Sequence, residues 1–112
     1  LQQTDNQKEA LKIYSKILEK NPNIPNLLLS RGHLYKNFGQ INKSIESYKS
    51  AYKLNKSFGD SYWRLANLKT YKFTQKEILL LKDMVNDEFI PDEEKIFMHF
   101  ALGKSYEDSN DY

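Results

Sequence analysis

The sequence predicts an all-α fold built from repeated pairs of helices, and three observations support this prediction. Apolar residues recur three and four positions apart along nearly the whole chain, and no segment alternates in the way a β-strand does. Only three prolines and four glycines interrupt the 112 residues. One short sequence pattern also recurs twice along the chain. We therefore expect about six antiparallel helices joined by short loops.

Three helices are predicted in the first half of the chain, over residues 5–20, 25–37 and 41–54. In each of them apolar residues recur along one face of an amphipathic helix, and in the first they follow the spacing i, i+3, i+4 and i+7. The first helix ends before Pro22, because a proline ring cannot continue a helix. Pro25 suits the first turn of the second helix, where its missing N–H has no intrahelical partner to lose.

Three further helices are predicted in the second half. An apolar stripe over residues 58–70 predicts the fourth. The fifth begins after Thr74, where the sequence Thr-Gln-Lys-Glu is a capping box whose hydroxyl and carboxylate satisfy backbone N–H groups reciprocally. The last begins at Asp92, followed by two glutamates that suit the positive end of the helix dipole, and it runs to about Glu107.

Composition narrows the class of protein. A hydrophobic content of 39% is low for a thick globular core and suits a thin, elongated array of helices. The absence of cysteine excludes disulfides, thiolate zinc sites and cysteine nucleophiles. No apolar run could span a bilayer and the first residues do not resemble a signal peptide, so we expect a cytoplasmic protein without membrane contact. Because the chain begins with Leu1 instead of Met, we expect it to be part of a longer protein.

The small net charge of +2 conceals two halves of opposite sign. Residues 1–72 hold 13 basic and 5 acidic residues, a net charge of +8, whereas residues 73–112 hold 4 basic and 10 acidic residues, a net charge of −6. The lysines of the basic half are scattered singly at helical spacing, which favours a solvated helix face over a nucleic-acid surface. We therefore expect no nucleic-acid partner. The two poles could attract complementary partners or other copies of the chain.

The recurring pattern has a small residue between bulky ones, at Gly32, Ala66 and Gly103, which are 34 and 37 residues apart. In the next predicted helix Ser44 and Tyr48 continue the first occurrence. With this spacing the chain resembles the tetratricopeptide (TPR) repeat family over essentially its full length. The resemblance implies a right-handed superhelix, an α–α solenoid in which the small residue lets two helices approach closely and an aromatic residue fills the space between them.

The resemblance also implies an organisation into repeats. Residues 1–22 are the second helix of a truncated repeat, 25–58 a repeat, 59–95 a longer atypical repeat, and 96–112 the first helix of a further repeat. Polar residues stand where the family usually has an apolar, aromatic or proline residue at Arg31, Lys56, Lys69 and Lys82.

Two segments are similar to a narrower group, bacterial proteins that join a TPR array to a sulfotransferase domain. These segments are residues 61–73 (SYWRLANLKTYKF) and 97–108 (FMHFALGKSYED), and residues 110–112 resemble the turn into the next helix. The resemblance implies that a catalytic domain lies C-terminal to this chain in the parent protein. None of that domain's catalytic residues matches a position here.

The residues themselves provide no catalytic, cofactor or metal site. The four glycines are too far apart for a phosphate-cradling loop. His33 and His99 lie in different repeats and are better explained as surface residues than as a metal pair. The acidic residues between Asp87 and Glu94 lack the ligand spacing of a calcium loop. We therefore expect a chain without enzymatic activity, cofactor or metal.

Recognition of another protein is the function class that remains. The first helices of TPR repeats line the concave surface, and their outward stripe here mixes amide, cationic and aromatic side chains. Trp63, beside Asn67 and Arg64, is suited to anchoring a peptide or a partner helix. The alternative is that Trp63 and Phe100 bury against each other, or under a further helix of the fourth repeat. The predicted groove residues are Asn26, Leu29, His33, Lys36, Trp63, Arg64, Asn67, Phe100 and Lys104.

We therefore expect a non-catalytic protein-interaction module that binds a peptide or partner through this groove. One alternative is a regulatory or substrate-presenting segment of a sulfotransferase, which a phosphate-loop motif further along the full-length sequence would settle. A second alternative is self-association, as a homodimer through apolar helix faces exposed at the two ends. A carboxylate clamp of the chaperone-binding kind is not expected, because Leu29 and Trp63 occupy positions that would need polar residues.

Overall fold

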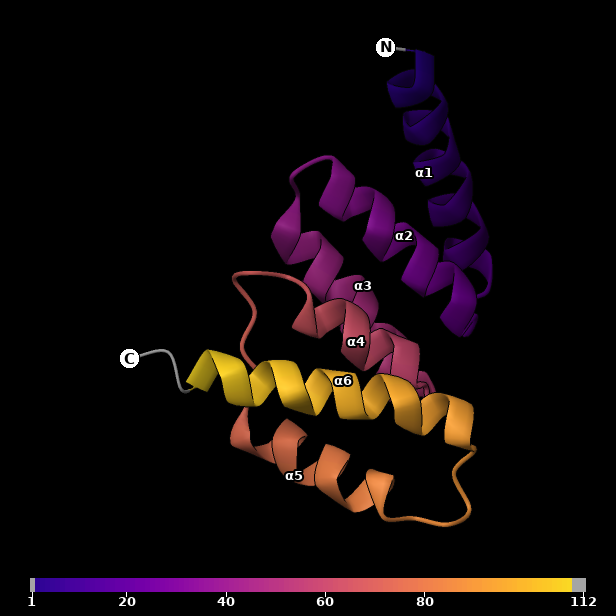
Figure 1. The fold of residues 1–112 in the computed structure, drawn as a ribbon. Helices are drawn as coiled ribbons and strands as arrows, with labels where there is room; N and C mark the ends of the chain where they lie inside the picture. The colour runs from indigo at the N-terminus through magenta and orange to yellow at the C-terminus, as the bar shows by residue number, and fades with distance from the viewer. Residues whose placement is uncertain (1, 110–112) are drawn as a thin grey trace. The chain divides into compact units, whose positions relative to one another are not determined.

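The structure is a computed structural model, and it describes residues 2–109 (Figure 1). Every regular element in this range is an α-helix, which confirms the predicted all-α fold class. The helices are α1 (Gln2–Lys20), α2 (Pro25–Asn37), α3 (Ile41–Leu54), α4 (Gly59–Ala66), α5 (Gln75–Val85) and α6 (Asp92–Ser109). The turn predicted at residues 110–112 lies outside the described range.

The helices belong to two compact units that divide after Leu54. Unit 1 contains α1, α2 and α3, and unit 2 contains α4, α5 and α6. Each unit has its own internal packing and is described by itself below. The repeat boundaries given above are a different division of the chain and stay a prediction.

Unit 1 is organised around the hairpin of α2 and α3. Three residues join these helices, and Gly39 among them has a φ of 76°, a conformation that residues with a side chain rarely adopt. The N–H of Gly39 donates to the carbonyl of Lys36 and the N–H of Gln40 to that of Tyr35, both at 2.9 Å. The end of α2 therefore keeps backbone hydrogen bonds through the turn, and α2 and α3 pack side by side (Figure 1).

The two helices approach each other closely at Gly32, as the repeat pattern predicted. A Cβ atom added to Gly32 would lie 2.6 Å from Cε1 of Tyr48 on α3. The Tyr48 side chain is only 1% exposed, so its ring has little room to move away. The Ser44 hydroxyl donates to the carbonyl oxygen of Gly32 at 2.7 Å. This hydrogen bond and the ring contact together fix how α3 lies against α2.

Arg31 stands where the family resemblance led us to expect an apolar residue, and the structure gives it polar and aromatic partners. Its Nε donates to the Ser47 hydroxyl at 3.1 Å. Its guanidinium carbon lies 5.8 Å from the ring centroid of Tyr35, within the range of a cation–π interaction. The side chain is partly buried, so its apolar stem packs while its charged end stays partnered.

α1 also packs against α2, less extensively than α3 does. Leu18, near the end of α1, is buried. Ile13 and Ile17 belong to the same predicted apolar stripe and are 49% and 41% exposed. Part of the apolar face of α1 is therefore accessible to solvent.

In unit 2, α4 packs mainly against α6. The two helices meet at the start of α4, where the N–H of Gly59 donates to Oε1 of Glu94 at 2.8 Å. A Cβ atom on Gly59 would overlap the Glu94 carbonyl oxygen, so only glycine fits between the two helix ends. The other small residues of unit 2 differ in role: Ala66 is buried, whereas a Cβ on Gly103 would meet nothing within 4 Å.

α4 ends at Ala66, earlier than the apolar stripe of residues 58–70 predicts. Leu68 is buried, and the N–H of Tyr71 donates to its carbonyl at 3.1 Å, which closes a turn. The Tyr71 hydroxyl then donates to the Glu77 carboxylate, whose two oxygens lie 2.6 and 2.8 Å away. The bond from Tyr71 to Glu77 stabilises the turn over a longer helix, and helical periodicity does not show this bond.

The predicted capping box at the start of α5 is confirmed. Thr74 Oγ1 accepts from the N–H of Glu77 at 3.1 Å, and Glu77 Oε1 accepts from the N–H of Thr74 at 2.9 Å. The buried Glu77 carboxylate thus caps α5 and holds the preceding turn at once. None of the helices in the described range is both long enough and apolar enough to cross a membrane.

Candidate functional site

Two aromatic residues of the predicted groove meet in unit 2. The rings of Trp63 on α4 and Phe100 on α6 have centroids 5.3 Å apart and are inclined at 44° to each other. Trp63 is partly exposed and Phe100 is 56% exposed. The rings therefore contact each other, but neither ring is buried in the way that the alternative interpretation expected, and both present apolar surface to solvent.

The packing of α4 and α6 explains why these two rings lie at the edge of the unit. On α4, Tyr62 and Leu65 are fully buried, and on α6, Met98 and Ala101 are fully buried. Successive residues of a helix point about 100° apart, so positions adjacent to buried ones emerge at the border of the core. The core of unit 2 thereby fixes the backbone on which the ring pair stands.

Polar residues of the predicted groove stand close to these rings along α4 and α6. Nε of Arg64 lies 3.2 Å from Oδ1 of Asp60, one helical turn earlier, in a partly exposed salt bridge. Such a pair contributes at most about 1 kcal/mol, so the guanidinium can exchange Asp60 for a ligand at little cost. Asn67 is exposed at the end of α4, and Lys104 stands one turn beyond Phe100 on α6. These groups can donate hydrogen bonds to peptide carbonyls or carboxylates.

The predicted groove residues of unit 1 all belong to α2. Asn26, His33 and Lys36 are exposed. Leu29 is only 8% exposed, so it offers a ligand little surface. That these residues and the unit 2 set line one continuous groove stays a prediction.

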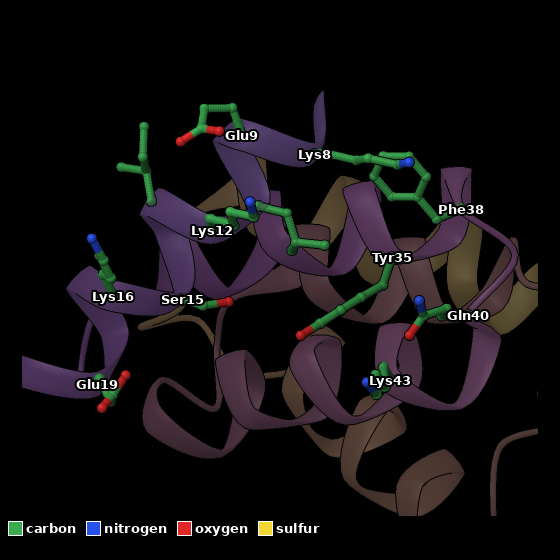
Figure 2. A pocket seen from close by; sticks show the side chains of 12 residues that line it. Lys8, Glu9, Lys12, Ser15, Lys16, Glu19, Tyr35, Phe38, Gln40 and Lys43 are labelled. Atoms are coloured by element: carbon green, nitrogen blue, oxygen red, sulfur yellow. The ribbon is translucent and has the colours of Figure 1, made fainter. Parts of the chain in front are cut away.

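Unit 1 also contains a cleft of 740 Å³ that the sequence did not lead us to expect. Figure 2 shows Lys8, Lys12 and Lys16 along α1, with other lining residues supplied by α2, α3 and the turn between them. We call it the lysine cleft, and its charged and aromatic lining includes Lys8, Lys12, Lys16, Tyr35, Phe38 and Lys43. Nζ of Lys43 lies 5.7 Å from the ring centroid of Tyr35, a cation–π distance.

A sequence signal for this cleft exists in the spacing of its lysines. Lys8, Lys12 and Lys16 follow each other at intervals of four, which places them on one face of α1. Taken alone, that spacing is typical of a solvated face. What distinguishes it here is that Tyr35 and Phe38 line the same cleft, and this juxtaposition depends on tertiary packing.

The titratable groups of unit 2 indicate structural roles. Burial raises the pKa of the Tyr62 phenol well above its ordinary value, and the negative charge of Glu77 raises it further. The Tyr62 hydroxyl donates to the carbonyl of Lys56 at 2.7 Å and so acts as a neutral hydrogen-bond donor. Within the part of the chain that the structure describes, no group of three or more His, Asp and Glu side chains could hold a metal ion.

Comparison with protein families identifies one match. A family model described as a tetratricopeptide repeat matches residues 13–46, from the second half of α1 through α2 into α3. No curated protein and no solved structure matches the chain. The family match supports a TPR protein and lies where Gly32, Ser44 and the closely packed α2–α3 hairpin were described.

Proposed function

We propose that this chain, whose residues 13–46 match a TPR family model, is a non-catalytic protein-interaction module that binds a peptide or partner protein along the exposed face of its helices. TPR arrays use extended helical surfaces to bind other proteins. The observation that carries the proposal is the Trp63–Phe100 ring pair, which is held by buried neighbours yet remains partly exposed.

The ring pair offers enough apolar surface to anchor a ligand. An aromatic side chain buries about 150–250 Å² when it is enclosed, so the exposed 56% of Phe100 leaves roughly 100 Å² or more for a partner. At about 25 cal/mol per Å², covering this surface stabilises a complex by about 2–3 kcal/mol. The rigid backbone beneath the rings limits the entropy lost on binding.

Polar groups on the same two helices can give the ligand its orientation. Asn67 can pair with a peptide amide, while Arg64 and Lys104 favour acidic or carbonyl-bearing ligands. Because the salt bridge of Arg64 with Asp60 is partly exposed, its replacement by a ligand carboxylate has a small energetic cost. A ligand with an apolar side chain followed by acidic or amide groups is the chemistry that this surface fits.

The proposal can be tested before the natural partner is identified. Peptides are selected on the wild-type chain from a displayed random library, and their affinities are measured by calorimetry. Trp63 is the only tryptophan of the chain, so its fluorescence reports binding at the proposed site directly. We expect Trp63→Ala and Phe100→Ala each to weaken binding by about thirtyfold, the effect of losing about 2 kcal/mol.

A matched control is available on α5, where Leu79 is 53% exposed and lies outside the proposed site. Leu79→Ala should change the affinity less than about twofold. The far-ultraviolet circular dichroism of each variant shows whether it is folded. If Trp63→Ala loses helix content, the affinity of Phe100→Ala shows whether the ring pair binds the peptide. Selection of no peptide, or equal affinity of selected peptides for Phe100→Ala and wild type, contradicts the proposal.

The narrower hypothesis of a sulfotransferase-linked array rests on the resemblance of residues 61–73 and 97–108 alone. In the structure the first segment covers most of α4 and the turn held by Tyr71, and the second lies within α6. In this hypothesis the module presents or orients the acceptor of a separate catalytic domain. The sequence of the complete gene product tests it, because a glycine-rich phosphate loop beyond this segment would support the hypothesis and the lack of one would contradict it.

A further inference from the structure

We propose that the lysine cleft of unit 1 binds the acidic loop between α5 and α6 of a second copy of this chain. The contact would join unit 1 of one copy to unit 2 of the next. It does not use the Trp63–Phe100 pair, so it is independent of the function proposed above.

The loop that enters the cleft carries one aromatic side chain among carboxylates. Phe89 is 87% exposed, the largest exposure among the large hydrophobic side chains that the structure describes. Exposed acidic side chains stand on both sides of it, including Glu88 and Asp92. An aromatic residue in that setting gains most from a site that offers both an apolar surface and positive charge.

Hydrogen bonds within the loop hold the backbone around Phe89 in a turn. The Asp87 carboxylate accepts from the N–H of Phe89 at 2.9 Å, and the Asp87 carbonyl accepts from the N–H of Ile90 at 3.2 Å. The loop therefore has a defined shape before binding, which lowers the entropy lost when it docks. Asp87 serves the turn, which leaves Glu88 as the side chain whose charge can be changed without altering these bonds.

The lysine cleft matches this loop in chemistry and size. Four lysines against two glutamates line it, so its local charge is positive. Tyr35 and Phe38 supply aromatic surface for the Phe89 ring. A volume of 740 Å³ lies within the usual range of ligand pockets and admits an aromatic side chain with its flanking backbone.

The charge of the two units favours a second copy as the occupant. Unit 1 holds nine basic and four acidic residues, and unit 2 holds eight basic and eleven acidic residues. Head-to-tail contact brings the positive unit of one copy to the negative unit of another, whereas like units repel. Because each copy carries both the lysine cleft and the acidic loop between α5 and α6, the contact can repeat from one molecule to the next.

Sedimentation equilibrium over micromolar to millimolar concentrations tests the proposal. A single loop in a cleft buries less surface than a standard interface, so we expect weak association, with the apparent mass rising above the 13.3 kDa monomer only at high concentration. Raising the salt from about 0.05 M to about 0.5 M should weaken association at least fivefold, because screening acts on the exposed charges of the rim.

Charge reversals with matched controls identify the two surfaces. Lys12→Glu and Glu88→Lys should each weaken association about tenfold or more, and Phe89→Ala should weaken it similarly. The control Lys76→Glu on α5 makes the same change in net charge as Lys12→Glu but lies outside the cleft, and it should not weaken association. A mixture of the Lys12→Glu and Glu88→Lys chains should associate again, since a wild-type cleft then meets a wild-type loop.

Three results would overturn the proposal. One is a wild-type chain that stays monomeric at millimolar concentration in low salt. Another is association that survives Phe89→Ala and Glu88→Lys but is lost in Lys12→Glu, which assigns the cleft to a different occupant. The third is association that is lost only in Ile17→Lys, which shows that the copies meet through the exposed apolar face of α1.

Discussion

Replacing Gly32 by alanine should destabilise the chain, because the added methyl group collides with a buried ring. The new Cβ would lie 2.6 Å from Cε1 and 2.7 Å from Cδ1 of Tyr48. These atoms belong to a rigid ring that is 1% exposed, and the hydrogen bond from Ser44 to the Gly32 carbonyl resists separation of the helices. The clash between the new Cβ atom and the Tyr48 ring is therefore removed only if α2 and α3 shift against each other.

The magnitude follows from two opposing effects. Alanine favours the helix over glycine by about 0.8–1 kcal/mol. Overpacking a tight core costs about 1–3 kcal/mol. The net result for Gly32→Ala is a loss of up to about 2 kcal/mol in the free energy of unfolding.

Gly103→Ala measures the preference of a helix for alanine over glycine without any overpacking. Gly103 lies inside α6, and a Cβ there would meet no atom within 4 Å. This substitution should therefore raise the free energy of unfolding by about 0.5–1 kcal/mol. Both variants are compared with wild type in urea titrations followed by circular dichroism, where 1 kcal/mol moves the midpoint by about 0.5 M for a chain of this size. If Gly32→Ala stabilises the chain as much as Gly103→Ala does, the close approach of α2 and α3 is not what requires glycine.

Three further substitutions test other parts of the structure. Thr74→Ala removes the hydroxyl that caps α5 and should cost about 1 kcal/mol of unfolding free energy in urea titrations, whereas Thr74→Ser should cost much less. Gly59→Ala places a methyl group on the Glu94 carbonyl and should cost about 2 kcal/mol or more, with amide hydrogen exchange accelerated at the start of α6 if the steric argument is right. Tyr62 has a raised pKa, so the folded state holds its proton more tightly and the stability from this residue is complete below about pH 10 and lost at higher pH. Tyr62→Phe should therefore flatten the fall of stability above pH 10 and cost about 1 kcal/mol at neutral pH by leaving the Lys56 carbonyl without its donor, and an unchanged alkaline slope would contradict this assignment.

The helices could be predicted from the sequence where local signals determine them. The bounds of α2 and α3 follow from Pro25, from the glycine turn at Gly39 and from continuous apolar stripes. The start of α5 follows from the capping box. The role of Gly32 could also be predicted, because close packing of two helices leaves a small residue at a fixed distance from an aromatic one.

The remaining features depend on contacts between residues far apart in sequence. Nothing near Gly59 in the sequence indicates that the start of α6 lies against it. The early end of α4 depends on the bond from Tyr71 to Glu77, which the periodicity of residues 58–70 cannot reveal.

The candidate sites show the same limit. The exposed stripe of α4 predicted Trp63 as a site residue, but its contact with Phe100 requires the packing of α4 on α6. The lysine cleft depends on how α1 packs against α2, so the spacing of Lys12 and its neighbours alone suggested only a solvated face.

The most direct test of the proposed interaction surface is chemical-shift mapping by nuclear magnetic resonance. A peptide selected on the wild-type chain is added to the labelled protein, and the backbone amides and the Trp63 indole N–H are followed. We predict the largest shifts at the Trp63 indole and at the amides around Phe100 and Asn67. Shifts confined to α5, with the Trp63 indole signal unmoved at saturation, would contradict the proposal that this ring pair binds the partner.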